Sequence, residues 1–227
     1  MVLAEAGLEL VPEDIQSHPA IVKNAKKRGK HPSKTLLDIS LHYKAMKSLD
    51  KWYKRGRPDI VHISLLCALS SPLNLANLLR VYIHTVNNIV IHVDPAVRIP
   101  RNYNRFVGLV EQLLLESKVP PGSEKPLMWV EKTTLKNFVQ ESRCDKVVVM
   151  HEHGTAMPLK KLGNHIADHM QRDENVCVIV GAFQHGDFGE ETLSLADELV
   201  SIFPRPLDTW VVVSRVIESV EVVLNIV

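Results

Sequence analysis

Residues 176–188, Val-Cys-Val-Ile-Val-Gly-Ala-Phe-Gln-His-Gly-Asp-Phe, carry the pattern that decides the fold of this chain. Five consecutive apolar residues are enough for a strand that is buried on both faces, and too few for an ordinary helix. A loop that contains two glycines follows this strand at once. The same pattern, a short apolar run and then a loop, recurs at 147–155 and at 199–207.

Helical patterns separate these runs. The polar residues of the tail recur every three to four positions, at Ser214/Arg215, Glu218, Glu221 and Asn225, which predicts a helix there despite the many valines. Strands alternating with helices predict an α/β fold with a mostly parallel sheet flanked by helices. The remaining predicted strands are 8–11, 81–84, 89–93 and 127–130, and the remaining predicted helices are 60–69, 100–114, 134–141 and 159–170.

We expect residues 1–227 to form a single domain. A basic segment at about 17–56 is predicted to be an insertion, loop-rich over 18–32, and Pro120-Pro121-Gly122 is the clearest chain breaker. No apolar run approaches the roughly 18 residues that a membrane helix needs. Glu5 comes too early for a signal peptide, and three cysteines without a CxxC pair exclude a disulfide framework and a thiolate zinc site. These features predict a cytoplasmic protein in a reducing compartment, with no membrane partner.

The charge is unevenly distributed along the chain. The formal net charge is +1, but between Lys23 and Arg57 twelve Lys and Arg face two Asp, a net charge of +10. From Asp173 to the end, ten acids face two arginines, a net charge of −8. The basic segment between Lys23 and Arg57 indicates a polyanionic partner. The alternative is an ordinary solvated lysine-rich surface.

A second basic cluster lies at 98–106, Arg-Ile-Pro-Arg-Asn-Tyr-Asn-Arg-Phe. Pro100 suits a helix start, and we expect Arg101 and Arg105, four residues apart, to share a polar face, with Arg98 just ahead. Guanidinium groups with Tyr103 between them suit phosphates and stacked bases. The arginines could instead pair with acids elsewhere in the fold.

Ligands of open α/β sheets bind beyond the carboxyl ends of the strands. The loops after 150, 180 and 202 are therefore the predicted ligand site, where Phe183 or Leu207 could cover a flat ring. Neither GxGxxG nor GxxxxGK[ST] is present, so a classical dinucleotide site or an ATPase is not indicated. His165 and His169 have the i, i+4 spacing of zinc ligands, but the neighbouring glutamate of that motif is missing, and we predict no metal site. Cys67 is expected in the core.

Longer motifs make this sequence similar to the ribosome-biogenesis pseudouridine N1-methyltransferases, a family of the SPOUT or α/β-knot methyltransferases. The resemblance covers essentially the whole chain, and its motifs are Leu8-Glu-Leu-Val-Pro12, His18-Pro19, Ala25-Lys-Lys-Arg-Gly29, Arg57-Pro-Asp59, Ser71-Pro-Leu-Asn74, Tyr82-Ile-His-Thr85, Arg98-Ile-Pro-Arg101 through Arg105-Phe, Gly181-Ala-Phe, His185-Gly-Asp-Phe188 and Ser194-Leu-Ala-Asp-Glu198.

The resemblance implies a SPOUT-type fold with a C-terminal deep trefoil knot at about 145–227, a homodimer, S-adenosylmethionine as cofactor, and a hairpin loop of small-subunit ribosomal RNA as substrate. In a eukaryote it would imply the nucleolus. The implied RNA-binding residues are Arg57, Arg98, Arg101 and Arg105. The implied cofactor-binding residues are Gly154, Gly181, Gly186, Ser201, Ile202, Phe203, Pro204, Arg205, Pro206 and Leu207. The stretch Phe203-Pro-Arg-Pro206 departs from the smaller polar residues expected there.

Pseudouridine has an N1–H that uridine lacks, and methyl transfer requires that nitrogen in line with the methyl donor, so positioning supplies most of the catalysis. The target base is expected to leave its stack to reach the donor. Asp59 and Arg57 are the predicted catalytic residues, with Asp59 orienting Arg57; alternatively, Asp59 only caps the following helix. A non-catalytic RNA-binding assembly factor on the same scaffold is the alternative function.

Overall fold

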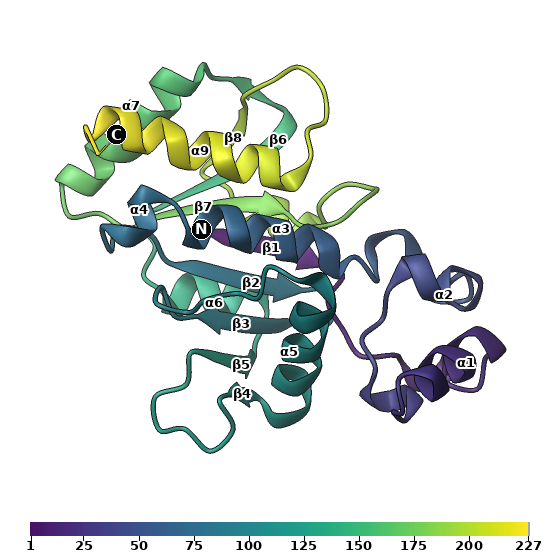
Figure 1. The fold of residues 1–227 in the computed structure, drawn as a ribbon. Helices are drawn as coiled ribbons and strands as arrows, with labels where there is room; N and C mark the ends of the chain where they lie inside the picture. Colours follow the sequence, from purple (N-terminus) through teal and green to yellow (C-terminus); the bar gives the residue numbers. More distant parts are fainter. Residues whose placement is uncertain (227) are drawn as a thin grey trace.

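One eight-stranded sheet forms the centre of the protein in the computed structural model, which describes residues 1–226. The strand order is β4-β5-β3-β2-β1-β7-β6-β8 (Figure 1). The strands are β1 Val2–Ala6, β2 Val81–Thr85, β3 Ile89–Val93, β4 Lys118–Val119, β5 Met128–Lys132, β6 Lys146–Ala156, β7 Val176–Gly181 and β8 Glu198–Ser201. The α-helices are α1 Pro19–Lys27, α2 Ile39–Met46, α3 Pro58–Leu69, α4 Pro72–Leu75, α5 Tyr103–Glu116, α6 Leu135–Glu141, α7 Leu159–Gln171, α8 Glu190–Leu193 and α9 Thr209–Val223.

The sheet has a parallel half and an antiparallel half. β1 runs parallel to β2 and β7, and β6 runs parallel to β7 and β8. β3 runs antiparallel to β2 and β5, and β4 runs antiparallel to β5. The sheet is therefore mixed rather than mostly parallel. The reason is the short turn at Asn87-Asn88, where Asn88 takes a positive φ of 54° and returns the chain directly beside β2.

Alternate residues of the central strands enter two hydrophobic cores, one on each face of the sheet. Leu3, Val148 and Val178 pack with α3, α5, α7 and α9, whereas their neighbours Val2, Val147 and Cys177 pack with α6. Because both faces of these strands are covered, both sets of alternating residues are apolar, and each strand is a continuous apolar run in the sequence. Among the described residues, no helix has the length and apolar character needed to cross a membrane.

Most predicted elements of the second half are confirmed, including the helical tail as α9. Two assignments in the first half were wrong. The first strand is Val2–Ala6, and residues 8–11 form only an isolated bridge between Leu10 and Leu36. The strand Val2–Ala6 was missed because the charged residue Glu5 interrupts its apolar pattern. In the structure Glu5 has a positive φ of 53°.

The basic segment at 17–56 contains the helices α1 and α2 rather than mainly loops. His18 caps α1 by accepting from the Ala20 N–H, and Asp38 caps α2 by accepting from the Ser40 N–H. The segment has a small core of its own that includes Ile21, Leu37 and Met46. In Figure 1 it lies beside the main body, beyond α3 and α5. The breaker at 120–122 connects the paired strands β4 and β5, so it is a hairpin connection and not a linker between domains.

Candidate active site

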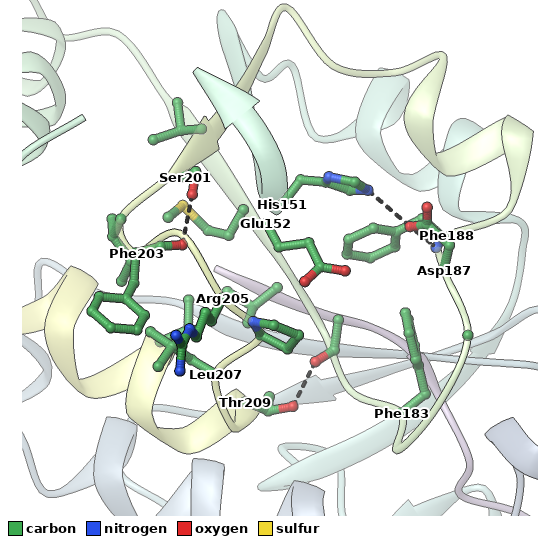
Figure 2. A pocket seen from close by; sticks show the side chains of 18 of the residues that line it. His151, Glu152, Phe183, Asp187, Phe188, Ser201, Phe203, Arg205, Leu207 and Thr209 are labelled. Carbon is green, nitrogen blue, oxygen red and sulfur yellow. Dashed lines mark hydrogen bonds and ion pairs between the residues drawn. The ribbon is translucent and has the colours of Figure 1, made fainter. Parts of the chain in front are cut away.

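A cavity of about 180 Å³ lies beside residues 150–152 of β6 and at the carboxyl ends of β7 and β8, where the sequence predicts a ligand site (Figure 2). Eight of the ten residues predicted to bind the cofactor line it. These are Gly181, Gly186, Ser201, Ile202, Phe203, Arg205, Pro206 and Leu207. The apolar part of the lining includes Phe183, Phe188 and Val212, and the charged part includes Glu152 and Asp187.

Two hydrogen bonds set the shape of the segment that follows β8. The Ser201 hydroxyl donates to the carbonyl of Phe203 at 2.9 Å, which turns the chain as it leaves the strand. The Thr209 hydroxyl, at the start of α9, donates to the carbonyl of Gly181 at 2.7 Å (Figure 2). The segment 201–209 is therefore fixed at both ends, with its second end tied to the end of β7.

Gly154 and Pro204 were the two other predicted cofactor residues, and neither lines the cavity. β6 does not end at Met150 but continues to Ala156, so Gly154 lies within a strand. A Cβ at this position would lie 2.6 Å from the backbone carbon of Leu199 and from the nitrogen of Val200. Gly154 thus permits β6 and β8 to approach closely, and its contact with β8 explains why the position holds a glycine.

An imidazole–carboxylate pair forms one side of the cavity. His151 Nε2 lies 2.8 Å from Asp187 Oδ1, and His151 Nδ1 accepts from the N–H of His153, so Nε2 carries the proton and donates (Figure 2). Burial alone would raise the pKa of Asp187, but hydrogen bonds from His151 and from the Phe188 N–H hold it below its ordinary value. Asp187 therefore stays ionised at the edge of the cavity.

Arg57 and Asp59 form a two-pronged ion pair at the start of α3. Arg57 Nε donates to Asp59 Oδ1 at 2.7 Å and Nη2 donates to Oδ2 at 2.6 Å. This pairing raises the pKa of Arg57. The N-cap of α3 is Arg57 and receives no side-chain cap, so Asp59 does not cap this helix. The Arg57 N–H bonds to the Gly7 carbonyl just after β1, which places the pair at the same sheet edge as the cavity.

The predicted arginines Arg98, Arg101 and Arg105 are all exposed, and none forms an ion pair within residues 1–226. Their alternative role as partners of acids in the fold is therefore not observed. One detail of the prediction was wrong. Asn102 caps α5 by accepting from the Arg105 N–H, so Arg101 lies ahead of the helix and does not share a helical face with Arg105.

The segment that carries these arginines is fixed against α3. His62 Nε2 lies 2.7 Å from the Pro100 carbonyl, and its ring stacks on Phe106 with centroids 4.4 Å apart. Tyr103 donates its hydroxyl to Asp38 Oδ2 at 2.6 Å, so this ring is tied to the basic segment. Burial and that hydrogen bond raise the pKa of Tyr103. These contacts bring Arg57 and the 98–105 cluster into one region of the surface.

The paired histidines of α7 contact acids. His165 Nε2 lies 3.3 Å from Glu198 Oε1, and His169 Nδ1 lies 2.6 Å from Glu174 Oε2. Over residues 1–226 no three His, Cys, Asp or Glu side chains are grouped as metal ligands. Each of these histidines therefore lies beside a single carboxylate.

Comparison with known proteins identifies the family. Residues 1–221 match the model of the EMG1/NEP1 methyltransferase family. The chain belongs to this family. It is 47% identical to "Ribosomal RNA small subunit methyltransferase Nep1" of Staphylothermus marinus, over 100% of this chain and 96% of that protein. It is 44% identical to the protein of the same name from Thermococcus kodakarensis, over 100% of this chain and 99% of that protein.

A solved structure is also similar, that of Archaeoglobus fulgidus Nep1 bound to S-adenosylhomocysteine. It shares 42% sequence identity with a TM-score of 0.86, and the match covers 99% of this chain and 97% of that one. The α/β sheet with its flanking helices is thus the architecture of an EMG1/NEP1 protein.

Sequence reasoning missed several residues at the cavity of this EMG1/NEP1 methyltransferase. His151, Glu152 and Asp187 were not predicted as site residues, although all three line the cavity. The His151–Asp187 pair joins residues 36 positions apart, and no local motif reports such a contact. Thr209 could have been found, since a hydroxyl at a helix start near a predicted ligand loop is a plausible anchor.

Proposed function

We propose that this protein uses S-adenosylmethionine to methylate N1 of a pseudouridine in small-subunit ribosomal RNA, in ribosome biogenesis. The observation that carries the proposal is the cavity beside residues 150–152 of β6 and at the carboxyl ends of β7 and β8, lined by eight of the ten residues expected to hold the cofactor. Membership of a methyltransferase family, relatives named for the small ribosomal subunit, and a similar structure with S-adenosylhomocysteine support it.

The residues of the cavity fit this cofactor. Phe203 and Leu207 are exposed apolar side chains suited to a flat heteroaromatic ring, and Glu152 and Asp187 suit a cationic group. A Cβ at Gly181 would lie 3.0 Å from the ring of Phe183 and 3.2 Å from the ring of Phe188. Because glycine has no Cβ, this volume stays free. When bound, S-adenosylmethionine supplies a methyl group on a positively charged sulfur, ready for attack by a nitrogen.

The role proposed for Arg57 and Asp59 is to orient the target nucleobase next to the cavity. Asp59 holds the guanidinium in a fixed plane, and the side chain of Arg57 is still 18% exposed, so it can reach a ligand. A fixed donor beside the methyl donor contributes by positioning, which is the main requirement of this reaction. Arg57 and Asp59 are the proposed catalytic residues in this sense.

The proposed RNA-binding residues are Arg57, Arg98, Arg101 and Arg105. Exposed, unpaired guanidiniums suit phosphates and the splayed bases of a single-stranded loop, and a hairpin loop of the ribosomal RNA is the proposed ligand. The same surface also suits the alternative role, a non-catalytic RNA-binding assembly factor. Cofactor binding and methyl transfer separate the two roles.

A C-terminal deep trefoil knot, a homodimer and a cytoplasmic location complete the proposal. The family resemblance carries the knot and the dimer, and the match of residues 1–221 to the EMG1/NEP1 family model supports that resemblance. An experimental structure traced from residue 145 onward tests the knot. Light scattering tests the dimer, with twice the mass of one chain as the expected result.

Isothermal titration with S-adenosylhomocysteine tests the cofactor assignment. We expect one site per chain in the wild-type protein, and strongly reduced affinity in Gly181→Val, whose side chain occupies the cavity. Gly108→Val, in the helix α5 where an added Cβ would meet nothing within 4 Å, is the control for a glycine replacement. An affinity unchanged by Gly181→Val would place the cofactor elsewhere, and RNA binding without any cofactor binding would favour the assembly factor.

A further inference from the structure

Lys54 is a buried lysine that the proposed reaction does not use. It ends the 3₁₀ turn Trp52–Lys54, at the end of the basic segment, and its side chain is only 7% exposed. Buried lysines are rare unless they are paired. None of its partners belongs to the basic segment, so Lys54 connects that segment to the body of the protein.

The three contacts of the Lys54 ammonium group converge on two elements. It donates to Glu5 Oε2 of β1 at 2.6 Å and to the backbone carbonyl of Asp187. It also lies 4.3 Å from the centroid of the Phe183 ring, a cation–π contact. Phe183 and Asp187 lie near the two ends of the loop 183–189, which follows β7. Three donors are available on an ammonium group, and all three directions are engaged here.

Glu5 continues this network to the far end of the same loop. Its Oε1 accepts from the Gly189 N–H at 2.8 Å and from the Thr192 hydroxyl at 2.7 Å. Glu5 has a positive φ of 53°, a conformation unfavourable for glutamate, at a bulge in the pairing of β1 with β2. A strained residue whose carboxylate makes three polar contacts is held in place by its surroundings.

The loop 183–189 is one wall of the cofactor cavity. Phe183, Asp187 and Phe188 line that cavity, whereas Lys54 does not. Gly186 shows how closely the loop rests on the turn, since a Cβ there would lie 2.8 Å from the ring of Tyr53 and 3.3 Å from the Lys54 side chain. Lys54 therefore lies behind the wall and contacts it from outside the cavity.

We propose that Lys54 is a positioning residue that holds the loop 183–189 in the shape that completes the cofactor cavity. This inference rests on the proposed cofactor assignment, and it adds a residue from the basic segment to the cofactor site. Because the contacts to Asp187 and Phe183 depend on the ammonium charge, an apolar side chain of similar length releases the loop. The arginines of the 98–105 cluster are not among the contacts of Lys54.

Hydrogen exchange in the ligand-free protein tests the positioning without reference to any cofactor. Lys54→Met is compared with Lys161→Met, an exposed lysine of α7, as the matched control. We expect faster exchange of the amides of 183–189, Gly189 above all, in Lys54→Met only. Exchange at the wild-type rate would overturn the proposal. If Lys54→Met does not fold, Lys54→Gln carries the same prediction, because it removes the ammonium charge, keeps a polar side chain and leaves the contacts of Glu5 with Gly189 and Thr192 in place.

Titration and kinetics then test the consequence. In Lys54→Met we expect affinity for S-adenosylhomocysteine to fall on the order of tenfold, as for loss of a hydrogen bond to a charged group. KM for S-adenosylmethionine should rise similarly, with kcat at saturation and KM for RNA within twofold of wild type. A parallel loss of both affinities would mean a merely structural role and overturn the proposal. If the wild-type protein bound no cofactor, the proposed function would fail. The hydrogen-exchange result would still show whether Lys54 holds the loop 183–189.

Discussion

Glu111→Gln tests how the basic segment is attached to the body. Glu111 of α5 is 1% exposed, accepts from both terminal nitrogens of Arg28 and from Lys30, and also accepts from the Leu36 N–H at 2.9 Å. Glutamine keeps the shape but removes the charge, and it turns one acceptor into a donor that faces donors. One buried carboxylate thus holds the α1 end of the segment against α5.

The expected loss of stability follows from these contacts. Removing one partner of a fully buried ion pair costs about 3–5 kcal/mol. Here the side chains of Arg28 and Lys30 are 27% and 38% exposed, so water solvates part of the released charge. We therefore expect the variant to lower the free energy of unfolding by about 2–3 kcal/mol. This value lies between the cost of breaking a fully buried ion pair and the roughly 1–3 kcal/mol for a buried group that loses its hydrogen-bond partner. For a protein of this size that corresponds to a Tm lower by roughly 4–12 °C.

The pH dependence gives an independent check. Burial alone would raise the pKa of Glu111, but hydrogen bonds from Arg28, Lys30 and the Leu36 N–H hold it below its ordinary value. A carboxyl group with a lowered pKa in the folded state stabilises the protein above its unfolded pKa, and this stabilisation is lost as the pH falls through the folded value. The difference between wild type and Glu111→Gln should therefore narrow below about pH 4.

Urea unfolding monitored by circular dichroism, from pH 7 down to pH 3, measures both quantities. Glu116→Gln, at the exposed end of the same helix, is the control and should change stability by no more than about 0.5 kcal/mol. A loss below 1 kcal/mol at pH 7, or a difference that does not depend on pH, would refute the argument.

Three further variants test the site. Asp59→Asn should reduce RNA affinity and methyl transfer while leaving stability nearly unchanged, because Asp59 does not cap α3; wild-type values in both assays would assign it no role in orienting Arg57. Arg105→Gln should lower the slope of log Kd against log salt by roughly one, and an unchanged slope would remove it from the RNA surface. Gly154→Ala should destabilise by about 1–3 kcal/mol through its contact with β8 and weaken S-adenosylhomocysteine binding. Gly108→Ala, where a Cβ meets nothing within 4 Å, should instead stabilise by about 0.5–1 kcal/mol, and similar effects of the two glycine replacements would contradict the packing argument.

Short-range sequence patterns predicted the strands and helices whose formation depends on neighbouring residues. The strands β6 and β7 and the helix α9 follow from apolar runs and from the spacing of polar residues. β1 was missed because Glu5 interrupts it, and the far end of β6 was missed because His151–Ala156 is mostly polar and resembles a loop. The helix α1 was missed because its three lysines outnumber Ile21 and Ala25, the two residues that it buries.

The candidate site divides in the same way. Glycines and apolar residues after buried strands indicated where the cavity lies, since strand polarity fixes that edge of the sheet. Lys54, Asp187 and Glu111 were not found, because their partners lie 36 to 133 residues away in the sequence and only the folded chain brings them together. The family resemblance supplied the cofactor and the substrate, which no composition or spacing contains.

Methyl transfer to a short hairpin that contains pseudouridine, compared with its uridine twin, tests the central claim most directly. With labelled S-adenosylmethionine, we expect label in the pseudouridine hairpin alone, recovered after digestion as the N1-methylated nucleoside. Label in both hairpins, or in neither while the protein binds both RNAs, would contradict the proposed reaction.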